Sequence, residues 1–217
     1  MRKKFTEAQI IQNYGVLFEN VKKDTVLATE LAEYGYDTTA IAQGGNLYQT
    51  LLAKYYTNKT ETAEEISAYA NFSAHFEALE AVYATDRKKA KIVFKGQTDV
   101  LKNLELVGTA PVRNASLLNT ISIFYNALLN NAAWLTALNR LKITATHVNE
   151  QLTKLATTNS AYAAYAQEKG ESQQATQDKN KAFDDVIKWV NEFYAVAKIA
   201  LEDKPQLLES VSKWVRS

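Results

Sequence analysis

The sequence predicts an all-α fold, a tandem-duplicated antiparallel helical bundle, and three observations lead to this prediction. Apolar residues recur at three- and four-residue spacing through almost all of the 217 residues, as they do on the buried faces of helices. The chain contains only 7 Gly and 2 Pro, so few positions interrupt long helices. The chain also aligns with itself without a gap at an offset of 107 residues, which places Ala90–Ile92 on Ala197–Ile199. Self-similarity at a fixed offset is typical of repeated units.

The two halves correspond in pattern more than in identity. Identical residues at this offset include Leu31/Leu138, Tyr55/Tyr162, Glu61/Glu168 and Phe76/Phe183. Apolar positions coincide more widely, as where Leu79 falls on Val186. We therefore predict two repeats, residues 1–107 and 108–217, packed together as one body. Two unrelated sets of helices with similar amphipathic spacing are the alternative.

Each repeat is predicted to hold three long helices and one short helix. In the first repeat the helices are expected over residues 6–33, 38–57, 62–94 and 98–106. Gly35 can adopt the left-handed conformation that ends the first helix, and Asp37 is a suitable N-cap for the second. Thr62-x-x-Glu65 has the spacing of a capping box and predicts the start of the third, which Gly96 ends.

The second repeat follows the same plan, with helices expected over residues 114–141, 144–169 and 171–202. Val107-Gly108-Thr109-Ala110-Pro111 has the composition of a linker and lies where the repeats join. Gly170 is predicted to separate two long helices, and Pro205 suits the first turn of the last, short helix. Whether the repeats form two stacked bundles or one interleaved body is left open by the sequence.

Composition and charge exclude several classes of function. The chain has no Cys, so disulfides, thiolate metal sites and a Cys nucleophile are excluded. Its net charge of +1 provides no general attraction for nucleic acid or an anionic membrane. No apolar signal-peptide core follows the basic start of the chain, and no transmembrane segment is expected. We expect a cytoplasmic protein, or one exported by a route without a signal peptide.

The residue patterns of catalytic and metal sites are missing from the sequence, so we predict no catalytic, cofactor-binding or metal-binding residue. The Glu-x-x-His spacing of di-metal helical bundles does not occur. His75 lies among apolar residues and is expected in the core or at its boundary, whereas His147 is expected on the surface near a helix start. Arg87–Lys91 is the one basic cluster, and on a near-neutral chain it is expected to be a solvated helix face.

Six residues are candidates for an interaction site. Gly44 and Gly45 lie inside a predicted helix, where each costs about 1 kcal/mol relative to Ala. They indicate either a kink or close helix crossing, or backbone opened toward a ligand or partner. The other four candidates are tyrosines near the ends of the first two helices: Tyr34, Tyr36, Tyr55 and Tyr56. They suit either helix-end packing or a protein interface, where Tyr is enriched.

A polar stretch covers residues 168–181, which contain almost no apolar side chains. A helix of this composition is expected to be solvated. A polar contact in an assembly is the alternative.

Two runs carry a resemblance to other proteins. Ile199–Glu209 (IALEDKPQLLE) and Phe124–Leu129 (FYNALL) resemble segments of a scattered group of uncharacterised all-helical bacterial proteins, mainly over residues 110–215. The resemblance implies a bacterial, helical protein without a signal peptide. Neither run is a catalytic motif, so the resemblance assigns no functional residue.

These observations lead us to expect a non-enzymatic structural or protein-interaction protein that can self-assemble. Two similar repeats offer two similar faces, and a head-to-tail contact between them can propagate into a ring or filament. The expected partners are copies of the chain itself or another protein. The alternative is a helical binding protein that holds an apolar small molecule or lipid between the repeats, in a cavity lined by aromatic residues and Gly44–Gly45.

Overall fold

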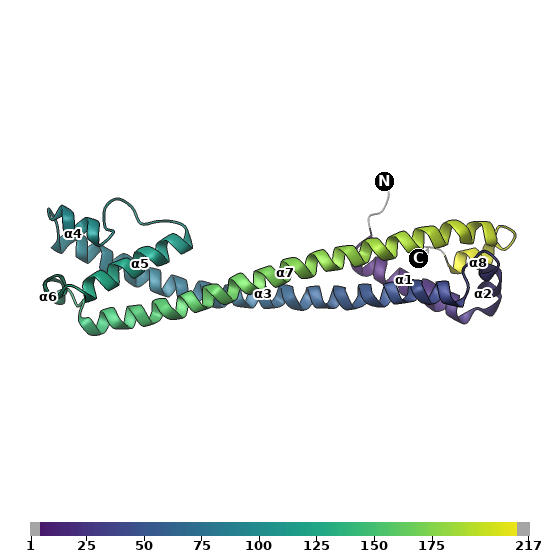
Figure 1. Ribbon diagram of the computed structural model, residues 1–217, viewed down its shortest axis with the longest axis horizontal. Helices are drawn as coiled ribbons and strands as arrows, with labels where there is room; N and C mark the ends of the chain where they lie inside the picture. Colours follow the sequence, from purple (N-terminus) through teal and green to yellow (C-terminus); the bar gives the residue numbers. More distant parts are fainter. Residues whose placement is uncertain (1–4, 212–217) are drawn as a thin grey trace. The chain divides into compact units, whose positions relative to one another are not determined.

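A computed structural model of the chain describes residues 5–211, and within them every regular element is a helix (Figure 1). In chain order the helices are α1 (Glu7–Lys23), α2 (Thr25–Ala32), α3 (Thr38–Val93), α4 (Thr98–Asn103), α5 (Asn114–Leu129), α6 (Ala132–Asn139), α7 (Ala145–Ala200) and α8 (Pro205–Ser210). The long helices α3 and α7 pack together. The predicted all-α class and antiparallel helical bundle are therefore confirmed.

The helix bounds follow the 107-residue offset. The helices α3 and α7 begin at Thr38 and Ala145 and end at Val93 and Ala200, so both ends differ by 107 positions. The same offset relates α2 to α6 and α4 to α8, and it relates the first residues of α1 and α5. The two halves therefore share one succession of helices. A common origin of the halves stays a prediction.

The helices predicted over residues 38–57 and 62–94 are one continuous helix, α3. The Thr62 hydroxyl donates to the Asn58 carbonyl at 2.7 Å, and the Thr60 hydroxyl donates to the Tyr56 carbonyl at 3.3 Å. Threonine in a helix can bond to the carbonyl four residues earlier in this way and so does not act as a cap. Each half accordingly has one long helix and three shorter ones, where three long helices and one short helix are predicted.

The helix α7 likewise joins the predicted helices 144–169 and 171–202. Gly170 lies inside it, and it is not among the described glycines with positive φ. A glycine ends a helix when the backbone turns left-handed, and otherwise costs a helix interior only about 1 kcal/mol. Gly170 therefore remains a helical residue.

The first predicted helix of each half is instead divided in two by a polar capping residue. Asp24 Oδ1 accepts hydrogen bonds from the backbone N–H groups of Val26 and Leu27, both at 3.0 Å, and so begins α2. At the matching position Asn131 Oδ1 accepts from the Trp134 N–H at 3.1 Å and begins α6. Such side chains satisfy N–H groups that have no partner within the helix.

Gly35, which was predicted to end the first helix, is left-handed with φ +86° in the turn that follows α2. The Tyr36 N–H donates to the Leu31 carbonyl at 3.0 Å and closes the turn. At the matching position in the second half Lys142 has φ +65°, so this turn keeps its left-handed residue even without glycine.

Two compact units are formed, and each takes segments from both halves of the chain. Within the described residues, unit 1 comprises 5–62 and 171–211, and unit 2 comprises 63–170. Helices α1, α2 and α8 belong to unit 1, and α4, α5 and α6 to unit 2. The helices α3 and α7, each about 84 Å long at 1.5 Å per residue, contribute one part to each unit. The compact units therefore differ in composition from the repeats 1–107 and 108–217.

Each unit has its own apolar core, and the two cores use matching positions. The core of unit 1 includes Leu17, Leu31, Val186, Val190 and Ala197. At the 107-residue offset these correspond to Phe124, Leu138, Leu79, Tyr83 and Ala90, which belong to the core of unit 2. The two units therefore share one arrangement of core positions, although the residues at those positions differ.

The polar stretch expected to be solvated is partly buried where it belongs to unit 1. Lys179 is buried and pairs with Glu7 at 2.8 Å, and Asp178 pairs with Lys54 at 2.7 Å. Ser172 is also buried. Lys179 and Asp178 thus have polar partners on α1 and α3, and these pairs allow a segment with few apolar residues to pack inside the unit.

Candidate functional site

A surface groove of about 490 Å³ lies in unit 1 between α1 and the first turns of α3. Its walls include Gly15, Phe18 and Lys22 from α1 and Gly45, Asn46 and Tyr48 from α3. The rings of Phe18 and Tyr48 pack against each other with centroids 5.5 Å apart. We call this feature the α1/α3 groove, and it combines an aromatic wall with exposed helix backbone.

Gly44 and Gly45 have different surroundings although they are adjacent. Gly44 is buried beneath the indole of Trp189, and a Cβ on residue 44 would lie 2.5 Å from the ring atoms. Gly44 therefore permits a close crossing of α3 and α7 in unit 1. A Cβ on Gly45 would meet no atom within 4 Å, and this residue lines the groove. The backbone at Gly45 is therefore open on that side.

The four candidate tyrosines do not share one environment. Tyr36 is half-buried and packs edge-on against Trp189 and Phe193, at centroid distances of 5.6 and 5.1 Å. Tyr55 is half-buried against the core of unit 1, and its ring contacts that of Tyr56 at 5.8 Å. Tyr34 and Tyr56 are exposed. Tyr36 is thus mainly a packing residue, and the two exposed tyrosines lie on separate elements, Tyr56 on α3 and Tyr34 in the turn after α2.

Two exposed side chains of unit 2, and a half-buried tyrosine beside them, were not anticipated from the sequence. Ile66 and Tyr69 of α3 are 65% and 51% exposed. The Tyr69 ring lies 5.3 Å from the ring of Tyr165 on α7, which in turn stacks on Phe72 at 6.1 Å with an interplanar angle of 2°. We call Ile66, Tyr69 and Tyr165 the aromatic patch. The three-residue spacing of Ile66 and Tyr69 indicates that they share a helix face. The same spacing is typical of buried helix faces, so it could not show that this face is exposed.

The corresponding positions of unit 1 are polar. At the 107-residue offset Ile66, Tyr69 and Tyr165 correspond to Gln173, Thr176 and Asn58. The Asn58 side-chain amide donates to the Thr176 hydroxyl at 2.9 Å, so a hydrogen bond in unit 1 occupies the place of the Tyr69–Tyr165 ring contact. The matching positions of unit 1 are therefore occupied by polar residues that bond to each other.

A buried polar network lies in unit 2 around Asp86, whose exposed fraction is 1%. The Tyr125 hydroxyl donates to Asp86 Oδ2 at 2.9 Å, and His147 Nε2 lies 2.5 Å from the same oxygen. Lys89 Nζ lies 3.3 Å from Asp86 Oδ1. Burial raises the pKa of Tyr125, and the negative charge of Asp86 and the hydrogen bond to it raise this pKa further. Tyr125 thus stays protonated as the donor.

This network changes the expected environments of both histidines. His147 does lie near a helix start, where its N–H donates to the Thr144 hydroxyl at 3.2 Å, but its side chain is mostly buried against Asp86. His75 is exposed, whereas a core or boundary position was predicted, although it lies within one helical turn of the buried Phe72 and Leu79. The partners of Asp86 are 39 and 61 residues away in sequence, so no local motif indicated them.

Two residues of the basic cluster Arg87–Lys91 donate hydrogen bonds to the end of the first half and to the linker that follows it. Arg87 Nη2 donates to the carbonyls of Leu106 and Gly108, at 3.3 and 2.9 Å, and Lys91 Nζ donates to the Gly108 carbonyl at 3.0 Å. The predicted solvated face is therefore correct only in part, for the exposed Lys88. The guanidinium and ammonium groups satisfy carbonyls that no helix pairs.

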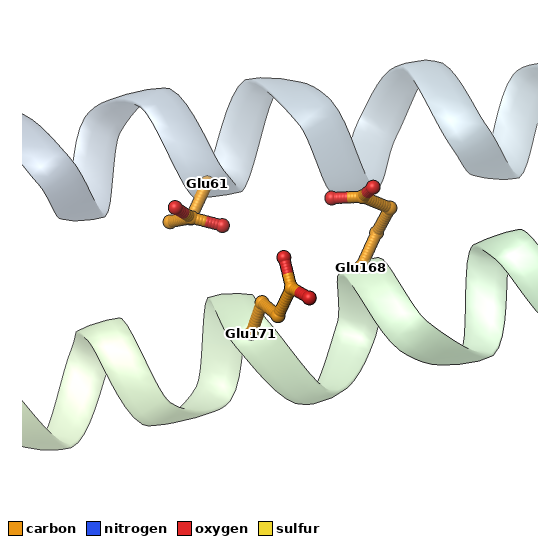
Figure 2. Close-up of side chains that lie close together, drawn as sticks. All are labelled: Glu61, Glu168 and Glu171. Atoms are coloured by element: carbon orange, nitrogen blue, oxygen red, sulfur yellow. The ribbon is translucent and has the colours of Figure 1, made fainter.

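Two carboxylates of unit 1, those of Glu61 on α3 and Glu171 on α7, face each other (Figure 2). An oxygen of each lies within 4.8 Å of an oxygen of the other. Figure 2 also draws Glu168, one turn earlier on α7. Carboxylates at this spacing are common without a bound ion, so we assign them no ligand.

Comparison of the chain with protein-family models, curated proteins and solved structures gave no match. Over the described residues, none of the helices has an apolar stretch long enough to cross a lipid bilayer. The class of protein that fold and site define is an all-α protein with two internally corresponding units. Its candidate sites are the α1/α3 groove, the aromatic patch and the Asp86 network.

Proposed function

We propose that this chain is a non-enzymatic protein-interaction protein, and that the aromatic patch of unit 2 is a surface through which it self-associates. The observation that carries the proposal is the difference between the units at this position. Unit 1 has Gln173, Thr176 and Asn58 where unit 2 has Ile66, Tyr69 and Tyr165. Burying the exposed side chains of Ile66 and Tyr69 against a partner removes apolar surface from water, which is favourable.

The chemistry of the patch suits a second copy of the chain. The rings of Tyr69 and Tyr165 contact each other at 5.3 Å, and the Lys169 ammonium group lies over the Tyr165 ring, 5.9 Å from its centroid. Aromatic residues are enriched in the centres of protein interfaces, with charged groups at the rim. Two copies can place the same patch against itself, which gives a closed two-fold dimer.

The Asp86 network supports the non-enzymatic part of the proposal. Asp86 and Tyr125 are almost completely buried and hydrogen-bonded to each other. A catalytic acid or base must reach its substrate, and these groups contact one another instead. Their best interpretation is internal packing between α3, α5 and α7 in unit 2.

Size-exclusion chromatography with light scattering over a range of concentrations tests self-association. We expect the wild type to form dimers, and Ile66→Asp to shift the protein toward monomer. Ile92→Asp is the matched control, because Ile92 is the same residue type on the same helix and is 69% exposed. It should behave as wild type. A wild type that stays monomeric at the highest concentration, or equal effects of both variants, would contradict the proposal.

A further inference from the structure

The α1/α3 groove of unit 1 has the dimensions and composition of a small-molecule site. Its volume of about 490 Å³ lies within the range of pockets that bind small organic ligands. One wall is the pair of tilted rings of Phe18 and Tyr48, which are both half-buried. Gly45 leaves the α3 backbone open on this side, so a flat group can lie against the helix.

The groove depends on residues that unit 2 does not share. At the 107-residue offset Gly45 corresponds to Leu152, and Lys22 corresponds to Leu129. Leu152 packs against the core of unit 2. A Leu side chain therefore occupies the place that Gly45 leaves open. The same scaffold forms with this position filled, so the opening at Gly45 is not needed for folding.

The charges around the groove favour an anion. Glu19 and Lys22 both line it, but the Glu19 carboxylate is paired with Lys23 at 2.5 Å. The hydrogen bond and the charge of Lys23, with a smaller contribution from Lys22, lower the pKa of Glu19. With Glu19 compensated by Lys23, the ammonium group of Lys22 is available to an incoming negative group. The side-chain amide of Asn46 adds a hydrogen-bond donor.

We propose that the α1/α3 groove binds a planar aromatic molecule that carries a carboxylate or a similar anionic group. The ring lies between the Phe18–Tyr48 wall and the backbone at Gly45, and the anionic group points to Lys22. This site shares no residue with the aromatic patch, so it is independent of the proposed self-association.

Binding is measured with two probes of nearly equal shape, naphthoate and naphthamide, by titration followed through amide NMR signals. Naphthoate carries the negative charge and naphthamide does not. We expect naphthoate to shift signals of residues 15–22 and 38–49, and to bind more tightly than naphthamide. Trp189 gives a second readout, because its ring lies 5.4 Å from that of Phe18.

Gly45→Leu tests the shape of the site. It installs the residue of unit 2 at a position where a Cβ meets no atom within 4 Å, so the variant is expected to fold. It should weaken both probes about tenfold or more, because the side chain occupies the groove. Gly170→Leu is the matched control, since a Cβ there also meets open space and Gly170 does not line the groove. It should leave both affinities unchanged.

Lys22→Met tests the charge. It should weaken naphthoate by about threefold to fivefold, as expected for a single solvent-exposed ionic contact, and leave naphthamide unchanged. The proposal is overturned if naphthoate signals map to unit 2, if Gly45→Leu binds as the wild type does, or if Lys22→Met affects both probes equally. Ellipticity melts of each variant separate lost binding from lost folding.

Discussion

The indole of Trp189 lies directly over Gly44 in unit 1, so that a Cβ on residue 44 would be 2.5 to 2.6 Å from three of its ring atoms. The ring cannot easily move aside, because Phe18, Tyr36 and Phe193 hold it at centroid distances of 5.2 to 5.6 Å. The neighbouring Gly45 has no such cover. Of these two adjacent glycines, Gly44 is therefore required by the close helix crossing, whereas Gly45 leaves space beside the helix.

We expect Gly44→Ala and Gly45→Ala to change stability in opposite directions. In an open helix position Ala is favoured over Gly by about 1 kcal/mol, so Gly45→Ala should raise the free energy of unfolding by nearly that amount. At residue 44 the added methyl group overpacks the core at a cost of about 1–3 kcal/mol, which outweighs the helical gain. Urea unfolding followed by circular dichroism measures both. Equal stabilisation by the two variants would show that Trp189 does not restrict residue 44.

Asp86 should stabilise unit 2 only while its partners are present. Tyr125→Phe removes one hydrogen bond and should cost about 1 kcal/mol. Asp86→Ala leaves the Tyr125 hydroxyl and His147 without their acceptor and should cost about 2–4 kcal/mol. Equilibrium unfolding in urea gives these values.

The matching positions in unit 1 are apolar. Asp86, Tyr125 and His147 correspond there to Phe193, Phe18 and Ala40, respectively. The triple variant Asp86→Phe, Tyr125→Phe, His147→Ala installs these residues in unit 2, and it should be less destabilised than the sum of the three single variants. Additive losses would mean that the three polar groups act independently.

Alkaline pH should unfold the protein through its buried tyrosines. Burial raises the pKa of Tyr14, Tyr83 and Tyr125 above the ordinary value of 10.0. Above pH 10 the unfolded chain releases these protons while the folded chain keeps them, so the free energy of unfolding falls as pH rises. Below pH 10 the folded and unfolded states both keep these protons, so the tyrosines give no pH dependence to the free energy of unfolding.

Unfolding experiments between pH 8 and pH 11 measure this dependence, with tyrosinate absorbance as a second readout. Tyr125→Phe removes one of the protons retained on folding, so its stability should fall less steeply above pH 10 than that of the wild type. An identical slope in the variant would contradict the assignment of a raised pKa to Tyr125 in the folded protein.

Arg87 should control local opening of the linker in unit 2 rather than global stability. Its guanidinium donates to the carbonyls of Leu106 and Gly108, so Arg87→Met should ease local opening by about 1 kcal/mol and speed amide exchange over residues 104–110 about fivefold. Lys88→Met, on the exposed neighbour, is the control. Hydrogen exchange detected by mass spectrometry separates the two, and faster exchange in both variants would point to general charge loss.

Local sequence signals predicted the helices themselves but not all their ends. Gly35 ended a helix as predicted, because a left-handed residue is a local requirement of the backbone. Asp24 divides a predicted helix, because its side chain accepts hydrogen bonds from the first N–H groups of α2. The capping tendency of aspartate was the only local signal for this division. Thr62 looked like a cap, yet its hydroxyl bonds backward to Asn58 inside α3. A capping residue and a mid-helix threonine differ only in which backbone group they bond.

The candidate sites were predictable only in part. Gly44 and Gly45 stood out because glycine is unfavourable inside a helix, and they do mark a close crossing and a groove wall. Asp86 carried no signal, because its partners Tyr125 and His147 are brought to it by packing between helices far apart in sequence. The roles of the tyrosines were ambiguous, because their spacing in the sequence does not distinguish a half-buried ring such as that of Tyr36 from an exposed one such as that of Tyr56.

By itself the sequence determined an all-α chain with the same succession of helices in each half, since helix formation follows from local periodicity and the 107-residue offset is written in the residues. Only the tertiary structure decided that each compact unit combines segments of both halves. It also decided the surroundings of matching positions: Gly45 lines a groove whereas Leu152 packs against a core, and Asp86 and Phe193 are both buried. These outcomes depend on which helices pack side by side, and that choice is made by contacts between residues distant in the chain.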